Sequence, residues 1–151
     1  MDSLNGFTFA GLVGNKGLNI SPLPPRQGRS RHSYGDGPFA KLVMPPLPLE
    51  PGIYAWRVNG RVTYLGQTRT TIAKRLGSMG YSTISNYNTF AREPGKRNGG
   101  QETNCRINAL ANEVLDRGEE IEIWYRITKA EESRQAESTW IERHGKPPWN
   151  R

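Results

Sequence analysis

The sequence has few of the features that mark secreted, membrane-bound or zinc-binding proteins. Its 151 residues include one cysteine, Cys105, which excludes an intrachain disulfide and a cysteine-ligated zinc cluster and favours a reducing, cytoplasmic environment. No segment approaches the run of about 18 apolar residues that a membrane helix needs, and the first residues do not resemble a secretion signal. We therefore expect no membrane partner. The G-K-[ST] motif that binds nucleotide phosphates is also missing, so we expect no nucleotide cofactor.

Acidic residues are absent from a long block in the middle of the chain. Residues 51–92 contain no aspartate or glutamate but carry six Lys and Arg side chains, whereas residues 113–142 contain nine acids and four bases. The formal net charge is +7, but this separation of charge along the chain is more informative. A nucleic-acid phosphate backbone is the natural partner of such a basic block. The side chains expected to bind DNA there are Arg57, Arg61, Arg69 and Lys74.

Residues 1–50 are expected to form a basic, proline-rich arm that precedes one folded domain, residues 51–151. Eight of the eleven prolines lie between residues 19 and 51, and so many prolines exclude a long helix or a central strand. An alternating apolar stretch at residues 7–13 could form one strand. The arm is expected to be extended and to pack along the domain or along a ligand. It is either a linker or a DNA-contacting segment, and in the second case Arg29 and Arg31 are the expected contacts.

A β-hairpin is expected at residues 52–66, and its turn decides where two tyrosines lie. Asn59-Gly60 separates two runs of β-branched and aromatic residues, and both turn residues tolerate positive φ. A two-residue loop places Tyr54 and Tyr64 on opposite faces of the sheet. A three-residue loop places them directly opposite each other, with Cβ atoms roughly 5 Å apart. If both phenols act on one substrate atom, the three-residue loop must be present.

The remaining patterns predict an α/β (α+β) domain in which a small three-stranded, mostly antiparallel sheet is flanked by helices. Strict alternation predicts the third strand at residues 120–127. Residues 80–102, rich in Gly, Ser and Asn, are expected to form a long loop. The expected helices are one from Thr70 or Thr71 through Met79, one capped by Thr103 and ended by Gly118, and one opened by a Thr128–Glu131 capping box and ended by Gly145.

The two ends of the hairpin resemble the paired motif of the GIY-YIG nucleases. Gly52-Ile53-Tyr54 matches the first half and Tyr64-Leu65-Gly66 the second, with Leu65 in place of the usual isoleucine or valine. The resemblance continues, in order, through Gln67-Thr68, Ile72, Arg75-Leu76, Glu137 and Asn150. Residues 99–108 resemble a segment of the small restriction-enzyme branch of this family.

This resemblance implies a divalent-metal-dependent endonuclease that hydrolyses phosphodiester bonds of double-stranded DNA, most like a type II restriction enzyme. Mg²⁺ is the implied cofactor, with Mn²⁺ as a substitute. Arg75 is implied to hold the scissile phosphate, a role that suits its planar, permanently charged guanidinium. Tyr54 is implied to position or deprotonate the attacking water, Tyr64 to hydrogen-bond beside it, and Asn150 to fix the C-terminal tail.

Glu137 is the implied protein ligand of the metal. Its spacing from Trp140 and Ile141 also places it beside the face of the last helix that should be buried, where a carboxylate is normally paired, protonated or bound to a cation. A surface carboxylate at the edge of that face is the alternative. Relatives often carry His or Tyr four residues after the arginine; that position is Met79 here, and Tyr81 is the candidate substitute.

Polar residues in the first turns of the second predicted helix are further candidates for DNA contact, namely Asn104, Arg106 and Asn108. Cleavage of both strands of a palindrome requires a homodimer or two sequential encounters. A structure-specific, repair, mobile-element or toxin-like nuclease is an alternative function. A catalytically silent DNA-binding module on the same scaffold is another.

Overall fold

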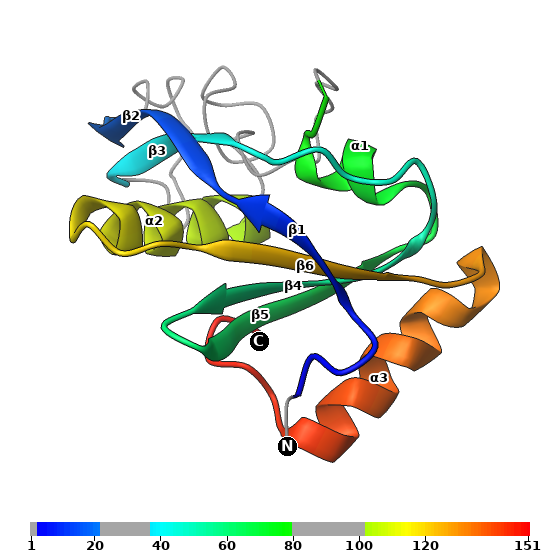
Figure 1. The fold of residues 1–151 in the computed structure, drawn as a ribbon. Helices are drawn as coiled ribbons and strands as arrows, with labels where there is room; N and C mark the ends of the chain where they lie inside the picture. Colours follow the sequence, from blue (N-terminus) through cyan, green and yellow to red (C-terminus); the bar gives the residue numbers. More distant parts are fainter. Residues whose placement is uncertain (1–2, 22–36, 80–101) are drawn as a thin grey trace, which may run out of the picture.

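The computed structural model describes residues 3–21, 37–79 and 102–151 and has an α+β fold (Figure 1). A four-stranded antiparallel sheet has the strand order β1-β6-β4-β5, and β2 and β3 form a separate antiparallel pair. The strands are β1 (Thr8–Leu12), β2 (Gly14–Ile20), β3 (Phe39–Val43), β4 (Gly52–Val58), β5 (Arg61–Thr68) and β6 (Glu122–Ile127). The helices are α1 (Ile72–Leu76), α2 (Glu102–Asp116), the 3₁₀ helix η2 (Ala130–Glu132) and α3 (Ser133–His144).

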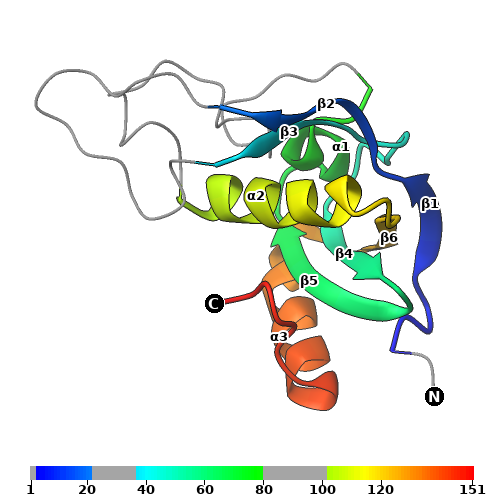
Figure 2. The same cartoon turned by 90° about the vertical axis from the view of Figure 1, so that its left-hand side faces the viewer.

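The four-stranded sheet packs a hydrophobic core on each of its faces. On one face, Tyr54 and Trp56 belong to a cluster that includes apolar residues of α1, α2 and β3. On the other face, Ala55 and Leu65 pack with Trp140 of α3. Figures 1 and 2 show α2 between the β2-β3 pair and the sheet, and α3 on the opposite side. Strand β5 is therefore an edge strand flanked by helices of both layers.

The predicted hairpin and third strand are confirmed, but the sheet is larger than the predicted three strands. Its fourth strand is β1, which pairs with β6 and comes from the region expected to be an arm. Residues 14–20 and 39–43 of that region form β2 and β3. In the described part of residues 1–50, the strand expected within residues 7–13 is confirmed as β1, and the segment packs along the domain, because apolar side chains such as Phe39 and Leu42 are buried. Arg29 and Arg31 lie outside the described residues.

The helices begin and end at different residues from those expected. Thr71 caps α1, as predicted, by accepting a hydrogen bond from the backbone N–H of Lys74 at 3.1 Å. The helix ends at Gly77, which is left-handed, so Met79 is not part of a buried stripe and is 53% exposed. The Thr128–Glu131 capping box is not formed, because η2 comes first and α3 begins at Ser133. Among the described residues, no helix is long and apolar enough to cross a lipid bilayer.

Candidate functional site

A bulge in the hairpin places the two motif tyrosines on the same face of the sheet. The loop contains two residues, Asn59 and Gly60, and both have positive φ, so the two-residue alternative is the one present. A register shift follows: Arg57 pairs with Val62 but Trp56 pairs with Tyr64, which leaves Thr63 as an extra residue on β5. Because side chains alternate between faces, one extra residue moves Tyr64 to the face that carries Tyr54.

The two tyrosines are diagonal neighbours on that face. Tyr54 lies opposite Gly66, and Tyr64 lies opposite Trp56, whose indole it meets edge-on at 6.4 Å between ring centroids. A diagonal pair is separated by roughly 7–8 Å, which is longer than the direct pair expected from the sequence. Their exposure also differs, since Tyr54 is 1% and Tyr64 is 7% exposed.

The glycines of both motif halves lie where another chain segment approaches closely. A Cβ on Gly66 would lie 2.5 Å from the Oη and Cζ atoms of Tyr54, so the phenol ring covers this glycine. A Cβ on Gly52 would overlap the backbone carbonyl oxygen of Arg126 on the neighbouring strand β6. A glycine is therefore needed at each position for packing, and neither glycine has positive φ.

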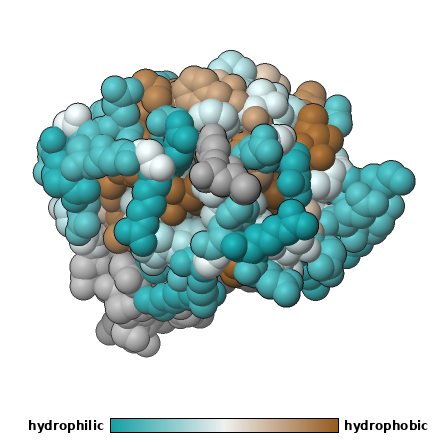
Figure 3. All heavy atoms as spheres, turned by 60° about the horizontal axis from the view of Figure 1, so that its bottom comes forward, coloured by the Kyte–Doolittle hydropathy of each residue, from teal (hydrophilic) through white to brown (hydrophobic). Residues whose placement is uncertain are grey.

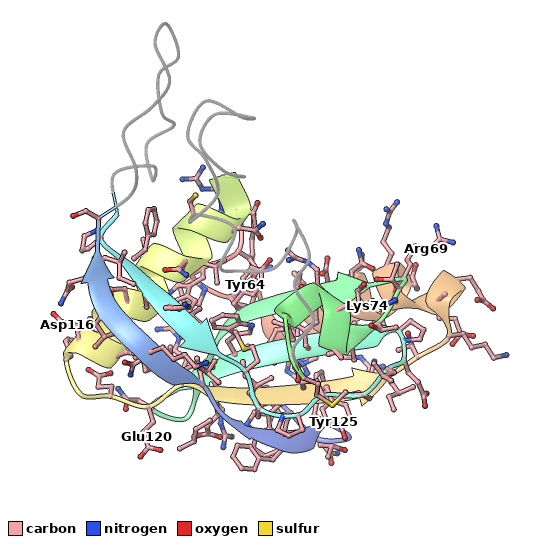
Figure 4. All side chains as sticks on the ribbon, turned by 90° about the horizontal axis from the view of Figure 1, so that it is seen from above. Tyr64, Arg69, Lys74, Asp116, Glu120 and Tyr125 are labelled. Carbon is pink, nitrogen blue, oxygen red and sulfur yellow. The ribbon has the colours of Figure 1, made fainter. Side chains whose placement is uncertain are left out.

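A hollow of about 360 Å³ lies at the outer edge of β5 and combines residues from four segments. In Figure 2, β5 lies with α2 above it, α3 below it and the C-terminal segment alongside it. Tyr64 forms one wall of the hollow, and Figure 4 shows this residue between α1 and α2. The lining residues are Tyr64, Leu65, Thr103, Arg106, Glu137, Asn150 and Arg151.

Glu137 reaches the hollow from α3 and is half-buried. Burial raises the pKa of its carboxyl group above the ordinary value, and the charge of Arg134 opposes this shift. Glu137 forms no hydrogen bond or ion pair with a described residue. A partly desolvated carboxylate without a partner is costly when it is ionised, and a bound cation would remove that cost.

Arg106 of α2 lines the hollow, whereas Arg75 of α1 does not. Both Nη atoms of Arg75 donate to the Oδ1 atom of Asn104, at 3.4 and 3.5 Å. Asn104 is fully buried, and its Nδ2 atom has no hydrogen-bond partner among the described residues. Arg106 lines the hollow and donates from Nε and Nη2 to the carbonyl oxygen of Trp149, at 3.3 and 3.1 Å. These contacts fix the planes of two guanidinium groups.

Asn150 joins the C-terminal tail to the edge strand. Its Oδ1 accepts from the backbone N–H of Leu65 at 2.9 Å, and its Nδ2 donates to the carbonyl oxygen of the same residue at 2.8 Å. The carbonyl oxygen of the bulged residue Thr63 accepts from the backbone N–H of Trp149 at 2.8 Å. The tail therefore occupies the free edge of β5 and forms one wall of the hollow.

Asn108 has a structural role and is not available to contact DNA, which corrects the expectation from the sequence. It is fully buried, accepts from the backbone N–H of Ala40 at 2.7 Å and donates to the carbonyl oxygen of Ala40 at 2.8 Å. One turn later, Asn112 makes a similar pair of bonds to Asn19. Asparagines spaced by four residues on α2 thus attach it to β2 and β3. The i, i+4 spacing is visible in the sequence, but the partner strands were not predicted.

The other residues predicted to bind DNA are dispersed. Arg57 is on the opposite face of the sheet from the tyrosines, where it is paired with Glu122 at 2.8 Å and stacked on Trp124. Arg61, Arg69 and Lys74 are exposed, and Figure 4 shows Arg69 and Lys74 at one end of the molecule and Asp116 and Glu120 at the other. Tyr81 lies outside the described residues.

The donor set suits a cation that brings most of its own ligands. No three His, Cys, Asp or Glu side chains gather as a metal site in the described ranges, so Glu137 is a single carboxylate. Mg²⁺ is commonly held by one or two carboxylates together with water and substrate phosphate oxygens, and an unpaired carboxylate in an open hollow fits that mode.

Comparisons with models of protein families, with curated proteins and with solved structures found no match.

Proposed function

We propose that this protein is a divalent-metal-dependent endonuclease that hydrolyses phosphodiester bonds of duplex DNA. The observation that carries the proposal is the convergence of Tyr64, Arg106 and the unpaired carboxylate of Glu137 on one hollow, although they come from a strand and two helices. The resemblance of residues 52–66, Arg75, Glu137 and Asn150 to the GIY-YIG nucleases supports the same chemistry. Charge supports the substrate class, since the hollow contains one acid and two arginines.

Each residue has a distinct task in this proposal. Glu137 would hold Mg²⁺, which would supply positive charge to stabilise the leaving 3′ oxygen. Arg75 bonds to Asn104 and does not line the hollow; the resemblance assigns it to the charge that develops on the phosphoryl oxygens. Arg106 binds a neighbouring phosphate oxygen, because its guanidinium is held at the wall of the hollow.

The attacking water is assigned to Tyr64 and not to Tyr54. Of the two phenols, only Tyr64 lines the hollow, whereas the ring of Tyr54 covers Gly66 and is 1% exposed. The water forms the new bond to phosphorus and loses its proton to solvent, while the bond to the 3′ oxygen breaks and that oxygen takes a proton from solvent. The hydroxyl of Tyr64 orients the water by a hydrogen bond. Tyr54 acts as a positioning residue that fixes β5 beneath the site.

Within this proposal, the biological role that we favour is a type II restriction enzyme that acts as a homodimer. A restriction enzyme is distinguished from a repair, mobile-element or toxin-like nuclease by its cut sites, because it cleaves one recurring sequence. A silent DNA-binding module would bind DNA without cutting it.

Incubation of the wild-type protein with plasmid tests the proposal. Mg²⁺ or Mn²⁺ should support conversion of supercoiled to linear plasmid, and EDTA should stop it. Mapping the ends by sequencing should show one recurring site with a 3′ hydroxyl and a 5′ phosphate. The DNA tested should be long enough to contain every short recognition site. If it stays intact with either metal, the proposal of a nuclease is rejected.

A further inference from the structure

A second basic surface lies on the C-terminal side of α3. Two hollows, of about 240 and 200 Å³, share the lining residues Ser3, Trp140 and His144 and are therefore neighbours. The larger one lies between the hairpin turn and the start of the C-terminal tail. The smaller one lies between α3, β6 and the N-terminal segment.

The lining of both hollows is basic and contains no acidic side chain. The basic side chains come from different parts of the chain, namely Arg61, Arg126, Arg143, His144 and Lys146. These five form no hydrogen bond or ion pair with a described carboxylate, although Arg126 stacks on Phe7 at 5.4 Å and His144 stacks on Trp140 at 4.7 Å. Like charges gathered without acids repel one another, and a bound polyanion would relieve that repulsion.

Stabilisation of α3 alone does not explain this cluster. Arg143 and His144 lie in the last turn, where positive charge complements the helix dipole. Arg61 and Arg126 belong to β5 and β6, so the dipole of α3 gives no reason for their position. Figure 3 shows the lower side of the molecule as largely hydrophilic with separate hydrophobic patches, which suits a polar ligand better than an apolar one.

The larger basic hollow continues along β5 from the candidate active site. One hollow is lined by Arg61 and Val62 and the other by Tyr64 and Leu65, with the C-terminal tail beside both. Strand residues rise by about 3.3 Å, so Arg61 lies within roughly 13 Å of Leu65 along β5, and the bulge at Thr63 shortens this distance. That distance corresponds to about four base-pair steps of B-DNA, because successive phosphates of one strand rise by about 3.4 Å along its axis.

We propose that these two hollows bind backbone phosphates of duplex DNA on one flank of the bond that is cut. The inference rests on the proposed function for its substrate, but binding does not require catalysis. The phosphates would lie about four base pairs from the scissile bond, and Arg143 and Lys146 would be the principal exposed contacts.

Binding of duplex DNA by the full-length chain in EDTA tests this inference separately from cleavage. The double variant Arg143→Ala, Lys146→Ala should bind a fluorescent 20-base-pair duplex about tenfold more weakly at 0.1 M salt. Its log–log salt slope should be shallower by about 1.8, because each phosphate contact contributes about 0.9. The charge-keeping variant Arg143→Lys, Lys146→Arg should restore most of both quantities.

The matched control is Lys16→Ala, Lys41→Ala, which removes two exposed positive charges from β2 and β3, a pair that lies on the other side of the sheet from α3. An equal loss in the control, or an unchanged slope in the hollow variant, would overturn the inference. Inorganic phosphate should be added at the concentration of the DNA phosphates. If it displaces the duplex, the hollows bind free phosphate and the inference is overturned as well. If the wild-type protein binds with these differences but never cleaves, the proposed function fails and this inference stands.

Discussion

Gly66 and Tyr54 show how a single residue position is constrained by packing. The ring of Tyr54 occupies the space where any side chain at position 66 would begin. We predict that Gly66→Ala lowers the free energy of unfolding by about 1–3 kcal/mol, because a buried ring must move to admit the methyl group. Urea denaturation measures this loss.

Gly14→Ala is the matched control for that substitution. Gly14 is also in a strand, and a Cβ there would meet Val43 at an ordinary 3.5 Å. Its free energy of unfolding should change by less than about 0.5 kcal/mol. Similar losses for the two variants would contradict the role assigned to the Tyr54 ring.

The raised pKa of Glu137 predicts a pH-dependent response to metal. A carboxyl whose pKa is raised by folding favours the folded state when protonated, and this contribution is lost as pH rises from the unfolded-state pKa through the folded-state pKa. Because Mg²⁺ should bind only the ionised carboxylate, it should restore the stability lost on ionisation at neutral pH. This stabilisation should become smaller as the pH falls toward the pKa of Glu137. At tenfold excess over its Kd, Mg²⁺ should stabilise the protein by about 1.4 kcal/mol, or about 3–6 °C in Tm.

Glu137→Gln serves as the control in the same thermal melts. It should raise Tm without metal at neutral pH, because the buried charge is gone, and it should abolish the shift caused by Mg²⁺. A shift of the same size in wild type and variant would place the metal elsewhere.

At the scale of elements, α2 is attached to the β2-β3 pair by asparagine side chains. Asn108→Ala leaves the backbone N–H and C=O of Ala40 without their buried partners. We predict a loss of about 2–4 kcal/mol in the free energy of unfolding, with DNA affinity of the folded protein unchanged. Chemical denaturation and fluorescence anisotropy measure the two quantities.

Asn15→Ala is the comparison for that variant, since Asn15 is exposed on β2. Its stability should stay within about 0.5 kcal/mol of wild type. A weaker DNA affinity of folded Asn108→Ala, with stability unchanged, would instead support the contact with DNA that the sequence suggested.

The hairpin shows which parts of the fold the sequence could predict. Asn59-Gly60 and the flanking β-branched and aromatic residues were sufficient for β4 and β5. The bulge at Thr63 was not predicted, because it depends on bonds to distant groups, including the N–H of Trp149. The two-residue loop was expected to separate the tyrosines to opposite faces, and the bulge is what returns them to one face. The strand β2 was missed because its residues Gly14–Ile20 are mostly polar or glycine, and β3 was missed because it is short and lies between Pro38 and Pro45.

The candidate site was predicted in part for a related reason. Tyr64, Glu137 and Asn150 were identified by resemblance, and the structure places all three around one hollow. Spacing also placed Glu137 beside a buried face. The hydrogen bonds that Arg75 and Arg106 make cannot be derived from spacing, since they join residues 29 and 43 positions apart.

At the scale of the whole molecule, two exposed basic side chains lie away from part of the acidic segment. Arg69 and Lys74 lie at the end opposite Asp116 and Glu120 (Figure 4). Binding of duplex DNA without metal should weaken with salt, with a log–log slope near −4 to −5 if about five phosphates are contacted. Anisotropy titrations at about 50 to 200 mM salt measure this slope. A binding constant that does not change with salt would remove DNA as the substrate.

The central claim is that Glu137 holds the metal that makes this protein a nuclease, and a comparison of cleavage and binding by Glu137 variants tests it most directly. Wild type, Glu137→Ala and Glu137→Gln should be incubated with plasmid and Mg²⁺, and their affinity for the same DNA measured in EDTA. We predict that both variants lose cleavage by about a thousandfold or more, since the leaving oxygen loses its metal, while their affinity stays within about twofold of wild type. Cleavage by either variant at the wild-type rate in Mg²⁺ would contradict the account.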